Sequence, residues 1–447
     1  MKTEQCMRNR KPMGIYDRLC SRQTSVGVVG LGYVGMPLAL EMAKHFNVVG
    51  FDLIKKVCNC NSTDYPPPSL NDDGSEAQYD GRPVIAGSVE DLADVGFYIV
   101  AVGTPVNDSH APDISQLLAA TESVGGMLKR GDYVVYESTV FPGCTEQECV
   151  PLLERISGLE CGRDFKVGYS PERINPGDQA HDLTNTPKII SGCDEEAVGE
   201  IARVYGRVVS APLWRASDIR SAESAKLLEN IQRCVNIALI NEMSMTLGRM
   251  GIDVSEVVRL ASSKWNFTAY SPGLVGGHCI PVDPYYMISE AARRGIDMPL
   301  TRLGCAVNES MAGYVADEVV RRISGYVAAD GRRPRVLVMG MAYKPDSDDI
   351  RNSGAVALRE CLSERGAECD VVDEMVDGES VKRMYGFELS DSPSGVYDAV
   401  VIAVAHECYR SLDDEWFARV TTGPEALLAD LGATYKGRIS NLRYWTL

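Results

Sequence analysis

The chain has 447 residues, with 62 acidic and 45 basic side chains and a net charge of -17. A single hydrophobic core stops growing at about 250 to 300 residues, so two or three domains are expected. The acidic balance, without any run of Lys and Arg, disfavours nucleic acid and anionic membrane as partners. A small anionic ligand is still compatible with it, because a few local Arg or Lys side chains and helix N-termini are enough to bind one.

The cysteine content predicts neither disulfides nor a metal. The 14 cysteines lie in a chain long enough to build a core, so a reducing cytoplasm fits them better than a disulfide framework. None of the five histidines completes a zinc-like spacing with them. Residues 1–20 carry scattered charges and no apolar segment, which predicts a frayed extension over 1–24 rather than a signal peptide or anchor.

The first periodic segment begins at Ser25 and predicts a βαβ unit. An apolar run ends at Gly30, helical spacing follows, and a second apolar run ends at Asp52. Because further strand-like runs alternate with segments of helical length, we expect a parallel, doubly wound sheet. A polar segment rich in Pro, Asp and Gly, residues 61–81, predicts a long surface loop. The further strand-like runs are residues 96–105, 132–140, 165–172 and 188–192.

Residues 217–251 lack an internal Pro, and their apolar residues recur at three- and four-residue spacing, which predicts a long central helix. A helix of this length usually buries one face against another domain or subunit, so a homodimer or a higher homo-oligomer is expected. After residue 335, three apolar runs repeat the strand-like pattern that predicts the first sheet. The expected fold is α/β, with two Rossmann-like doubly wound domains at 25–210 and 326–447 and a central helical region at 211–325.

The segment GLGYVG places Gly30, Gly32 and Gly35 between a predicted strand and a predicted helix. In a dinucleotide site the first glycine allows the tight turn, the second lets the backbone approach a pyrophosphate, and the third allows close helix packing. Asp52, at the end of the next strand, would accept hydrogen bonds from a ribose and repel a 2′-phosphate. NAD is therefore favoured over NADP.

A second glycine-rich segment, GGHCIPVDPYY, places Cys279 after Gly276 and Gly277, with Asp283 four residues later. The glycines would let backbone amides reach a phosphate or a sugar, and would expose the thiol to it. Taken alone, one cysteine among 14 is more often a small buried apolar residue than a reactive thiol. The adjacent His278 is a poor base for this thiol, since neighbouring residues of an extended loop project apart.

Seven segments in the order GLGYVGMPLA, VGTP, ESTVFPG, YSPERINPG, ESAKLLEN, GGHCIPVDPYY and MAYKPDSDDIRNS resemble the UDP-glucose/GDP-mannose dehydrogenase family from Ser25 to near the C-terminus. The resemblance implies a four-electron oxidation with NAD. The C6 alcohol of a nucleotide-linked sugar becomes an aldehyde, a cysteine captures it, a second hydride leaves, and water hydrolyses the thioester. It also implies that 25–210 binds NAD and 326–447 binds the UDP-sugar.

The same resemblance assigns site residues. Cys279 resembles the nucleophile, and Lys226 and Asn230, one helical turn apart, resemble the pair that stabilises the C6 oxyanion. Asp283 and Thr139 resemble the water-positioning pair. The resemblance implies that Glu172 is the base for thioester hydrolysis. The other implied NAD contacts are Tyr33, Val34, Gly103, Thr104, Thr139 and Arg351. The implied substrate contacts are Glu172, Arg173, Lys226, Asn230, Gly276, Gly277, Tyr343 and Lys344.

The segments SPERINPG, KWNF and LVGGHC are similar to the branch that acts on UDP-N-acetylglucosamine or UDP-N-acetylgalactosamine. UDP-N-acetylmannosamine and UDP-glucose are the alternatives within the family. Two interpretations from other classes are a two-electron NAD dehydrogenase that needs no cysteine, and a non-catalytic nucleotide-sugar binding protein. Both conflict with the joint presence of Cys279, Lys226, Asn230, Asp283 and Glu172.

Overall fold

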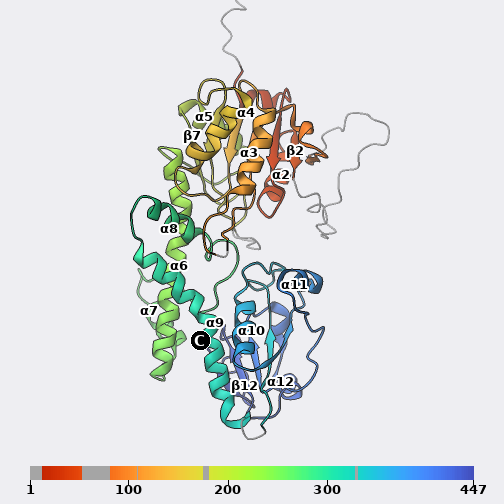
Figure 1. Cartoon of the computed structure of the whole chain (residues 1–447), viewed down its shortest axis with the longest axis vertical. Coiled ribbons are helices and arrows are strands. Elements are labelled where there is room, and N and C mark those ends of the chain that lie inside the picture. Colours follow the sequence, from red (N-terminus) through yellow and green to blue (C-terminus); the bar gives the residue numbers. More distant parts are fainter. Residues whose placement is uncertain (1–12, 53–80, 108, 175–180, 328–330) are drawn as a thin grey trace, which may run out of the picture. The chain divides into compact units, whose positions relative to one another are not determined.

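The computed structural model of the chain describes residues 13–52, 81–107, 109–174, 181–327 and 331–447. The chain forms two compact units, residues 1–228 and 229–447, and each contains one sheet (Figure 1). The predicted α/β class with Rossmann-like sheets is confirmed. Apart from Gly81, the loop predicted at 61–81 lies outside the described residues.

The sheet of the first unit has eight strands in the order β3-β2-β1-β4-β5-β6-β7-β8. Its neighbours pair in parallel except for β6 and β7, which are antiparallel, so the predicted all-parallel sheet has one exception. The strand order reverses between β1 and β4, which is where open sheets bind ligands. The strands are β1 Ser25–Val29, β2 Val48–Phe51, β3 Val84–Ile85, β4 Val95–Val100, β5 Tyr133–Tyr136, β6 Lys166–Tyr169, β7 Lys188–Gly192 and β8 Leu213–Arg215.

Helices cover both faces of this sheet, which explains why β1, β2, β4 and β5 are buried along their whole length. Phe97 and Ile99 of β4 pack in one cluster with residues of α1, α2 and α5. On the opposite face, the Tyr136 hydroxyl lies 3.1 Å from the Thr121 hydroxyl of α3. The helices are α1 Ile15–Cys20, α2 Gly35–Ala43, α3 Ser115–Met127, α4 Val150–Ser157 and α5 Glu195–Tyr205, with short turns η1 Val89–Leu92 and η2 Thr145–Cys149.

The prediction of a frayed N-terminal extension is wrong for its last part. Residues 15–20 form helix α1, whose Ile15 and Leu19 are buried in the core of the first unit. Arg203 of α5 donates hydrogen bonds to the carboxylate of Asp17 and stacks over the ring of Tyr16. A six-residue helix is unstable alone, so this packing against α5 is what orders it.

The predicted central helix is confirmed as α6, Ile219–Arg249, with 31 residues. The boundary between the two units falls inside it, after Leu228. In the second unit it packs against α9, Pro299–Val327, where the side-chain amide of Asn241 donates to the amide oxygen of Asn308 over 2.9 Å. The other helices of this region are α7 Val254–Ala261 and α8 Asp283–Arg293.

The second sheet has five parallel strands in the order β10-β9-β11-β12-β13. One face packs on α9 and α10, and the other packs on a cluster that includes Tyr409, Phe417 and Tyr435. The strands are β9 Arg335–Met339, β10 Glu368–Val372, β11 Ala399–Ile402, β12 Leu427–Asp430 and β13 Arg443–Trp445, with helices α10 Gly354–Glu364, α11 Gly378–Tyr385 and α12 Asp414–Val420 and the turn η3 Glu407–Ser411.

Candidate active site

The glycine-rich turn joins β1 to α2 in the first unit, and each glycine has its own steric reason. Gly30 has φ of +95°, and a Cβ there would lie 2.5 Å from the carbonyl oxygen of Ala101. A Cβ on Gly35 would lie 1.8 Å from the carbonyl oxygen of Gly30. In contrast, a Cβ on Gly32 would meet nothing within 4 Å. The turn is closed at Gly30 and Gly35 and open at Gly32, as a loop that approaches a pyrophosphate must be.

Asp52 follows β2 and lies beside this turn. Its Oδ2 accepts the backbone N–H of Leu31 over 2.7 Å, which fixes the carboxylate at the carboxyl end of the sheet. Two more predicted cofactor residues flank α2: Tyr33 has an exposed side chain, and Val34 is the residue before the helix begins. These residues fit the adenosine half of NAD, because the carboxylate faces the loop on which a pyrophosphate would bind.

The segments after β4 and β5 lie side by side at the same edge of the sheet. The hydroxyl of Ser138 accepts the N–H of Val102 over 3.0 Å and donates to its carbonyl oxygen over 2.7 Å. This clamp brings the predicted residues Gly103 and Thr104 next to the strand end that carries Thr139. Thr104 and Thr139 are both half-buried.

Glu172 and Arg173 follow β6 in the same unit. Glu172 Oε1 accepts the backbone N–H groups of Arg173 and Ile174, both over 2.6 Å. The guanidinium of Arg173 donates to the carbonyl oxygen of Pro187 over 2.8 Å. On the other side, Glu172 Oε2 lies 3.8 Å from the ammonium of Lys188, which the sequence did not single out.

Lys226 lies on α6 and is 8% exposed, so it is not the solvated surface lysine that a lone Lys on a helix usually is. One turn earlier, the fully buried Glu223 accepts the N–H groups of Gly143 and Thr145. Burial raises the pKa of Glu223 to about 7, although these backbone hydrogen bonds oppose the rise. Glu223 thus ties the loop after Thr139 to the helix of Lys226.

Asn230 and Asp283 meet in the second unit. The Asn230 amide donates to Oδ2 of Asp283 over 2.5 Å, and the two side chains are 3% and 2% exposed. Asp283 is the first residue of α8, and its N–H donates to the carbonyl oxygen of Cys279 over 2.8 Å. Cys279 itself is half-buried. The structure therefore places the predicted nucleophile one turn before a buried carboxylate that is held by Asn230.

Gly276 and Gly277 pack the cysteine loop against the loop that follows β9. A Cβ on Gly276 would lie 2.7 Å from the carbonyl oxygen of Asn352, and one on Gly277 would lie 2.7 Å from the ring of Tyr343. The N–H of Gly277 donates to the carbonyl oxygen of Arg351 over 3.2 Å. This amide is thus used within the protein, whereas the sequence suggested that it would reach a ligand.

Arg351 forms a two-pronged contact with Asp349 of the same loop. Its Nε and Nη2 donate to the carboxylate over 3.0 and 2.9 Å, and the Nε2 of His278 lies 2.6 Å from Asp349 Oδ2. Burial would raise the pKa of Asp349, but His278 and Arg351 outweigh it and hold that pKa well below its usual range. His278, the neighbour of Cys279, therefore contacts the carboxylate of Asp349.

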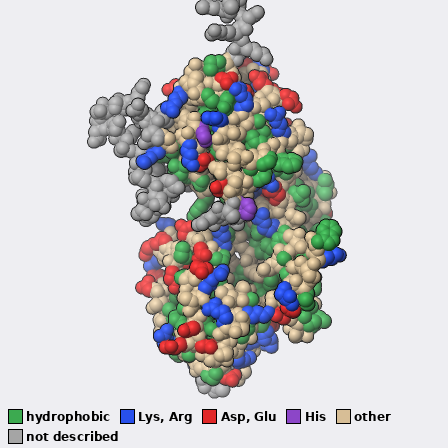
Figure 2. All heavy atoms as spheres, turned by 180° about the vertical axis from the view of Figure 1, so that it is seen from behind, with side chains coloured by type: hydrophobic (Ala, Val, Ile, Leu, Met, Phe, Trp, Pro, Cys, Tyr) green, Lys and Arg blue, Asp and Glu red, His purple; other side chains and the backbone are tan. Residues whose placement is uncertain are grey.

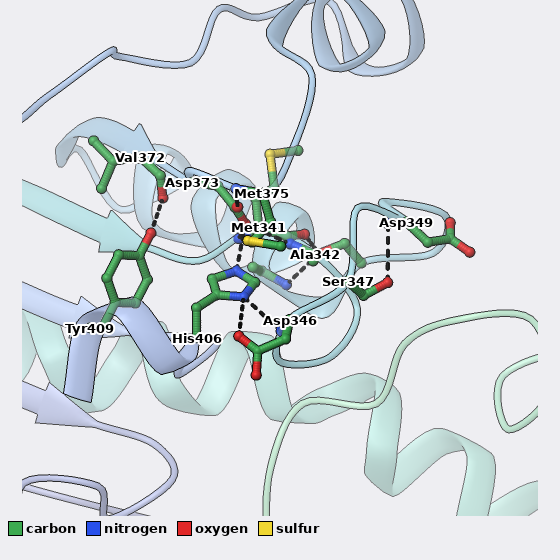
Figure 3. Close-up of polar contacts among 12 residues, drawn as sticks. Met341, Ala342, Asp346, Ser347, Asp349, Val372, Asp373, Met375, His406 and Tyr409 are labelled. Carbon is green, nitrogen blue, oxygen red and sulfur yellow. Dashed lines mark hydrogen bonds and ion pairs between the residues drawn. The ribbon is translucent and has the colours of Figure 1, made fainter. Parts of the chain in front are cut away.

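The loop 341–353, which carries Tyr343 and Lys344, is anchored by a buried histidine (Figure 3). The Nδ1 of His406 accepts the N–H of Asp346 over 2.8 Å, so its Nε2 carries the proton and donates to Asp373 Oδ2 over 3.0 Å. Asp373 also accepts the N–H groups of Met341 and Ala342. The ammonium of Lys344 lies 5.4 Å from the ring centroid of Tyr343.

A small pocket adjoins the cysteine loop in the second unit, lined in part by Ile280 and Pro281. Its remaining walls come from α6, α8 and α9. Within the part of the chain that the structure describes, no group of three or more His, Cys, Asp or Glu side chains is arranged to hold a metal ion. The other residues lining the pocket are Cys234, Val275, Tyr285, Cys305, Asn308 and Glu309.

Three models of one family match consecutive parts of the chain. The UDP-glucose/GDP-mannose dehydrogenase family matches with its NAD binding domain at residues 24–209, its central domain at 220–310 and its UDP binding domain at 337–437. The glycine turn and strands β1 to β7 of the first sheet lie in the first of these segments, and Cys279 lies in the second.

Full-length relatives carry the same assignment. The chain is 42% identical over 397 residues to a UDP-N-acetyl-D-glucosamine 6-dehydrogenase of Salmonella typhi, covering 88% of this chain and 92% of that protein. A protein of the same name from Pseudomonas aeruginosa is 41% identical, covering 88% and 93%. The solved structure of a UDP-D-ManNAc dehydrogenase from Pyrococcus horikoshii superposes with a TM-score of 0.82 at 30% identity, covering 94% and 98%. The chain therefore belongs to the UDP-glucose/GDP-mannose dehydrogenase family and is an NAD-dependent UDP-sugar dehydrogenase.

Proposed function

We propose that this enzyme oxidises the C6 alcohol of UDP-N-acetylglucosamine to the carboxylate, with consumption of two NAD and one water per sugar. The observation that carries the proposal is the position of Cys279, one turn before the buried Asn230 and Asp283 pair. The choice of sugar is supported by identity: the relatives named for UDP-N-acetyl-D-glucosamine are 41–42% identical, whereas the solved UDP-D-ManNAc dehydrogenase is 30% identical.

NAD supplies the hydride acceptor in both oxidations. Cys279 captures the aldehyde from the first oxidation as a thiohemiacetal, so that the intermediate stays bound while the cofactor is exchanged. The second oxidation yields a thioester on the same sulfur. Water then attacks its carbonyl carbon, the C–S bond breaks, and the carboxylate product and the Cys279 thiol are released.

Other residues take the roles that their environments allow. Lys226 and Asn230, four residues apart on α6 and both buried, would stabilise the negative charge on the C6 oxygen. Asp283 and Thr139 would position water, and Glu172 would accept its proton during thioester hydrolysis. Tyr343, Lys344, Arg173 and the glycines of the cysteine loop are the proposed UDP-sugar contacts.

The proposed NAD contacts divide between the pyrophosphate and the ribose. Gly30, Gly32 and Gly35 form the turn for the pyrophosphate, and Asp52 would accept the ribose hydroxyls. The remaining proposed contacts are Tyr33, Val34, Gly103, Thr104, Thr139 and Arg351. The guanidinium of Arg351 already pairs with Asp349. Arg351 would contact NAD only if this guanidinium also reaches the cofactor.

The test of the substrate is an NADH absorbance assay with UDP-N-acetylglucosamine, UDP-N-acetylgalactosamine, UDP-N-acetylmannosamine and UDP-glucose in turn. The proposal predicts the highest kcat/KM with UDP-N-acetylglucosamine. A higher value with one of the other three would move the assignment to that sugar. Absence of NADH with all four would instead favour the non-catalytic binding protein.

We further propose a homodimer that forms through the helical region of the second unit. Large hydrophobic side chains are exposed there on α6, α7 and the segments that follow them, and hydrophobic side chains are visible on the surface in Figure 2. Light scattering at micromolar concentration should give twice the mass of one chain, and a monomer would exclude the dimer. The exposed residues are Leu239, Met243, Met250, Ile252, Leu260, Trp265 and Phe267.

The proposed location is the cytoplasm, and the proposed partners do not include nucleic acid or membrane. No disulfide joins the cysteines of the described residues. None of the described helices combines the length and the hydropathy needed to cross a bilayer. On the face shown in Figure 2, Lys and Arg are interspersed with Asp and Glu rather than gathered into a basic patch. Fractionation of cells that express the full chain would test the location.

A further inference from the structure

A buried polar cluster in the first unit lies directly beside Glu172. The ammonium of Lys188 lies 2.9 Å from Glu137 Oε2 and 3.8 Å from Glu172 Oε2, and it donates to the carbonyl oxygen of Pro171 over 3.3 Å. The hydroxyl of Tyr205 donates to the other oxygen of Glu137. Lys188 and Glu137 are only 4% and 2% exposed. One buried cation therefore faces two carboxylates.

Glu137 is the fully satisfied member of the cluster. Both of its oxygens receive hydrogen bonds, one from Lys188 and one from Tyr205. Burial raises the pKa of Glu137, the charge of Lys188 opposes that rise, and the nearby Glu172 adds to it. The two carboxylates thus compete for the same ammonium.

Glu172 has a different arrangement. Its Oε1 accepts two backbone N–H groups, which fixes the direction of the carboxylate. Its Oε2 is buried and accepts no hydrogen bond from the described residues. Such an oxygen is costly unless a ligand or water supplies a donor, and the ammonium of Lys188 at 3.8 Å is the cation that favours its negative charge.

We propose that Lys188 is a positioning residue for thioester hydrolysis, which holds Glu172 ionised and oriented so that its Oε2 accepts a proton from the attacking water. This inference rests on the proposed function. In the step itself the water oxygen bonds to the thioester carbon, one water proton passes to Glu172 Oε2, and the C–S bond breaks with its electron pair on sulfur. No electrons are exchanged with another molecule, and Lys188 acts on this step through Glu172.

The position of Lys188 predicts which half of the reaction it serves. Oxidation of the alcohol, capture by Cys279 and the second oxidation do not need Glu172, so they should proceed without the ammonium. Hydrolysis should slow, and the thioester should accumulate. A single opposite charge within 4 to 6 Å lowers a carboxyl pKa by roughly 1 to 3 units. Loss of Lys188 removes this opposite charge, so the acid limb of the pH–rate profile for hydrolysis should move to higher pH.

Two substitutions move this limb in opposite directions. Lys188→Met removes the cation and should raise the apparent pKa of the acid limb. Glu137→Gln removes the competing carboxylate, so the ammonium of Lys188 faces only the carboxylate of Glu172. The acid limb of the pH–rate profile should therefore move to lower pH. Lys188→Arg keeps the charge and should restore the wild-type limb, which a merely structural role of the lysine would not require.

The experiment is a stopped-flow measurement of NADH with UDP-N-acetylglucosamine across pH, with mass spectrometry of the Cys279 peptide in quenched samples. For Lys188→Met the expected result is a burst of NADH at the wild-type rate, an accumulated thioester adduct, and slow turnover with a raised acid limb. An unmoved limb without adduct would overturn the inference.

Glu137→Gln keeps the test decisive if Lys188→Met does not fold, since an acid limb that stays or rises in that variant also overturns the inference. Failure of the proposed function is separately visible. In that case the wild-type enzyme forms fewer than two NADH per sugar, and the role of Lys188 falls with it. Two NADH per sugar in wild type together with unmoved limbs in both variants would reject Lys188 alone.

Discussion

The side-chain amide of Asn230 donates a hydrogen bond to the carboxylate of Asp283 over 2.5 Å, and both groups are almost completely buried. The contact joins α6 to the first turn of α8, whose N-terminus favours the negative charge of Asp283. Because the Asp283 N–H also bonds to the carbonyl oxygen of Cys279, a single carboxylate residue links the proposed oxyanion amide to the proposed nucleophile.

Two replacements of Asp283 should distinguish its contribution to the stability of the fold from its contribution to kcat. Asp283→Ala leaves the buried Asn230 amide without its acceptor, which should destabilise the fold by about 1 to 3 kcal/mol in urea unfolding. Asp283→Asn keeps an acceptor oxygen and should recover most of this loss. It lacks the negative charge, so kcat should stay about 100-fold or more below wild type. Wild-type kcat in Asp283→Asn would remove the carboxylate from the mechanism.

Gly32 and Gly35 form a matched pair for the cofactor loop. A Cβ at Gly35 would lie 1.8 Å from backbone, whereas one at Gly32 would meet nothing within 4 Å. We expect Gly35→Ala to lower the melting temperature and to abolish NAD binding. Gly32→Ala should keep the wild-type melting temperature and still weaken NAD binding in calorimetry, because its methyl group points to the space that the pyrophosphate would fill. Equal NAD affinity in Gly32→Ala and wild type would contradict this placement.

Glu223 should make the fold less stable as pH rises. Burial raises its folded-state pKa to about 7, above the ordinary value of 4.5, so the folded chain retains a proton that the unfolded chain has lost between these values. The associated stability is complete below the unfolded pKa and is lost as pH rises through about 7. Glu223→Gln imitates the protonated form. In urea unfolding, the free energy of unfolding of Glu223→Gln minus that of wild type should rise by roughly 2 to 3 kcal/mol from pH 5 to pH 8. A pH-independent difference would be inconsistent with the shift.

His406 should act on nucleotide affinity and leave the chemistry unchanged. His406→Phe removes the acceptor of the Asp346 N–H and one donor of Asp373, so the loop that carries Tyr343 and Lys344 loses its anchor. An orphaned buried donor costs about 1 to 3 kcal/mol, which corresponds to roughly 5- to 150-fold weaker UDP binding in calorimetry. Tyr409→Phe is the control, because the Tyr409 ring packs against the imidazole while its hydroxyl donates to the carbonyl oxygen of Val372 and not to the loop (Figure 3). Equal UDP affinity in both variants would show that the anchor is irrelevant.

The sequence predicted those features that short-range patterns encode. The alternation of apolar runs with helical spacing located β1, α2, β2 and the long helix α6, and glycine spacing located the turn that closes at Gly30 and Gly35. In both sheets an acid ends the second strand, Asp52 in one and Asp373 in the other, and both accept N–H groups of the preceding glycine turn. These contacts are local consequences of one βαβ geometry.

The features that the sequence did not reveal depend on tertiary contacts. The cluster of Glu137, Glu172, Lys188 and Tyr205 unites residues up to 68 positions apart, and a lysine at the start of a strand usually indicates a solvated strand end. Helix α1 is too short to carry a periodic signal, and it exists because Ile15 and Leu19 are buried against α5. The ESTV and ESAKLLEN segments did contain a signal for Glu137 and Glu223, since each begins with an acid that precedes an assigned site residue, Thr139 or Lys226, in the same segment.

The measurement that tests the central claim most directly is the number of NADH formed per UDP-N-acetylglucosamine consumed, for wild type and Cys279→Ser under the same conditions. Capture of the aldehyde by Cys279 predicts two NADH per sugar and a carboxylate product in wild type, and loss of the second NADH in Cys279→Ser. One NADH per sugar in wild type, or two in Cys279→Ser, would contradict the thioester mechanism.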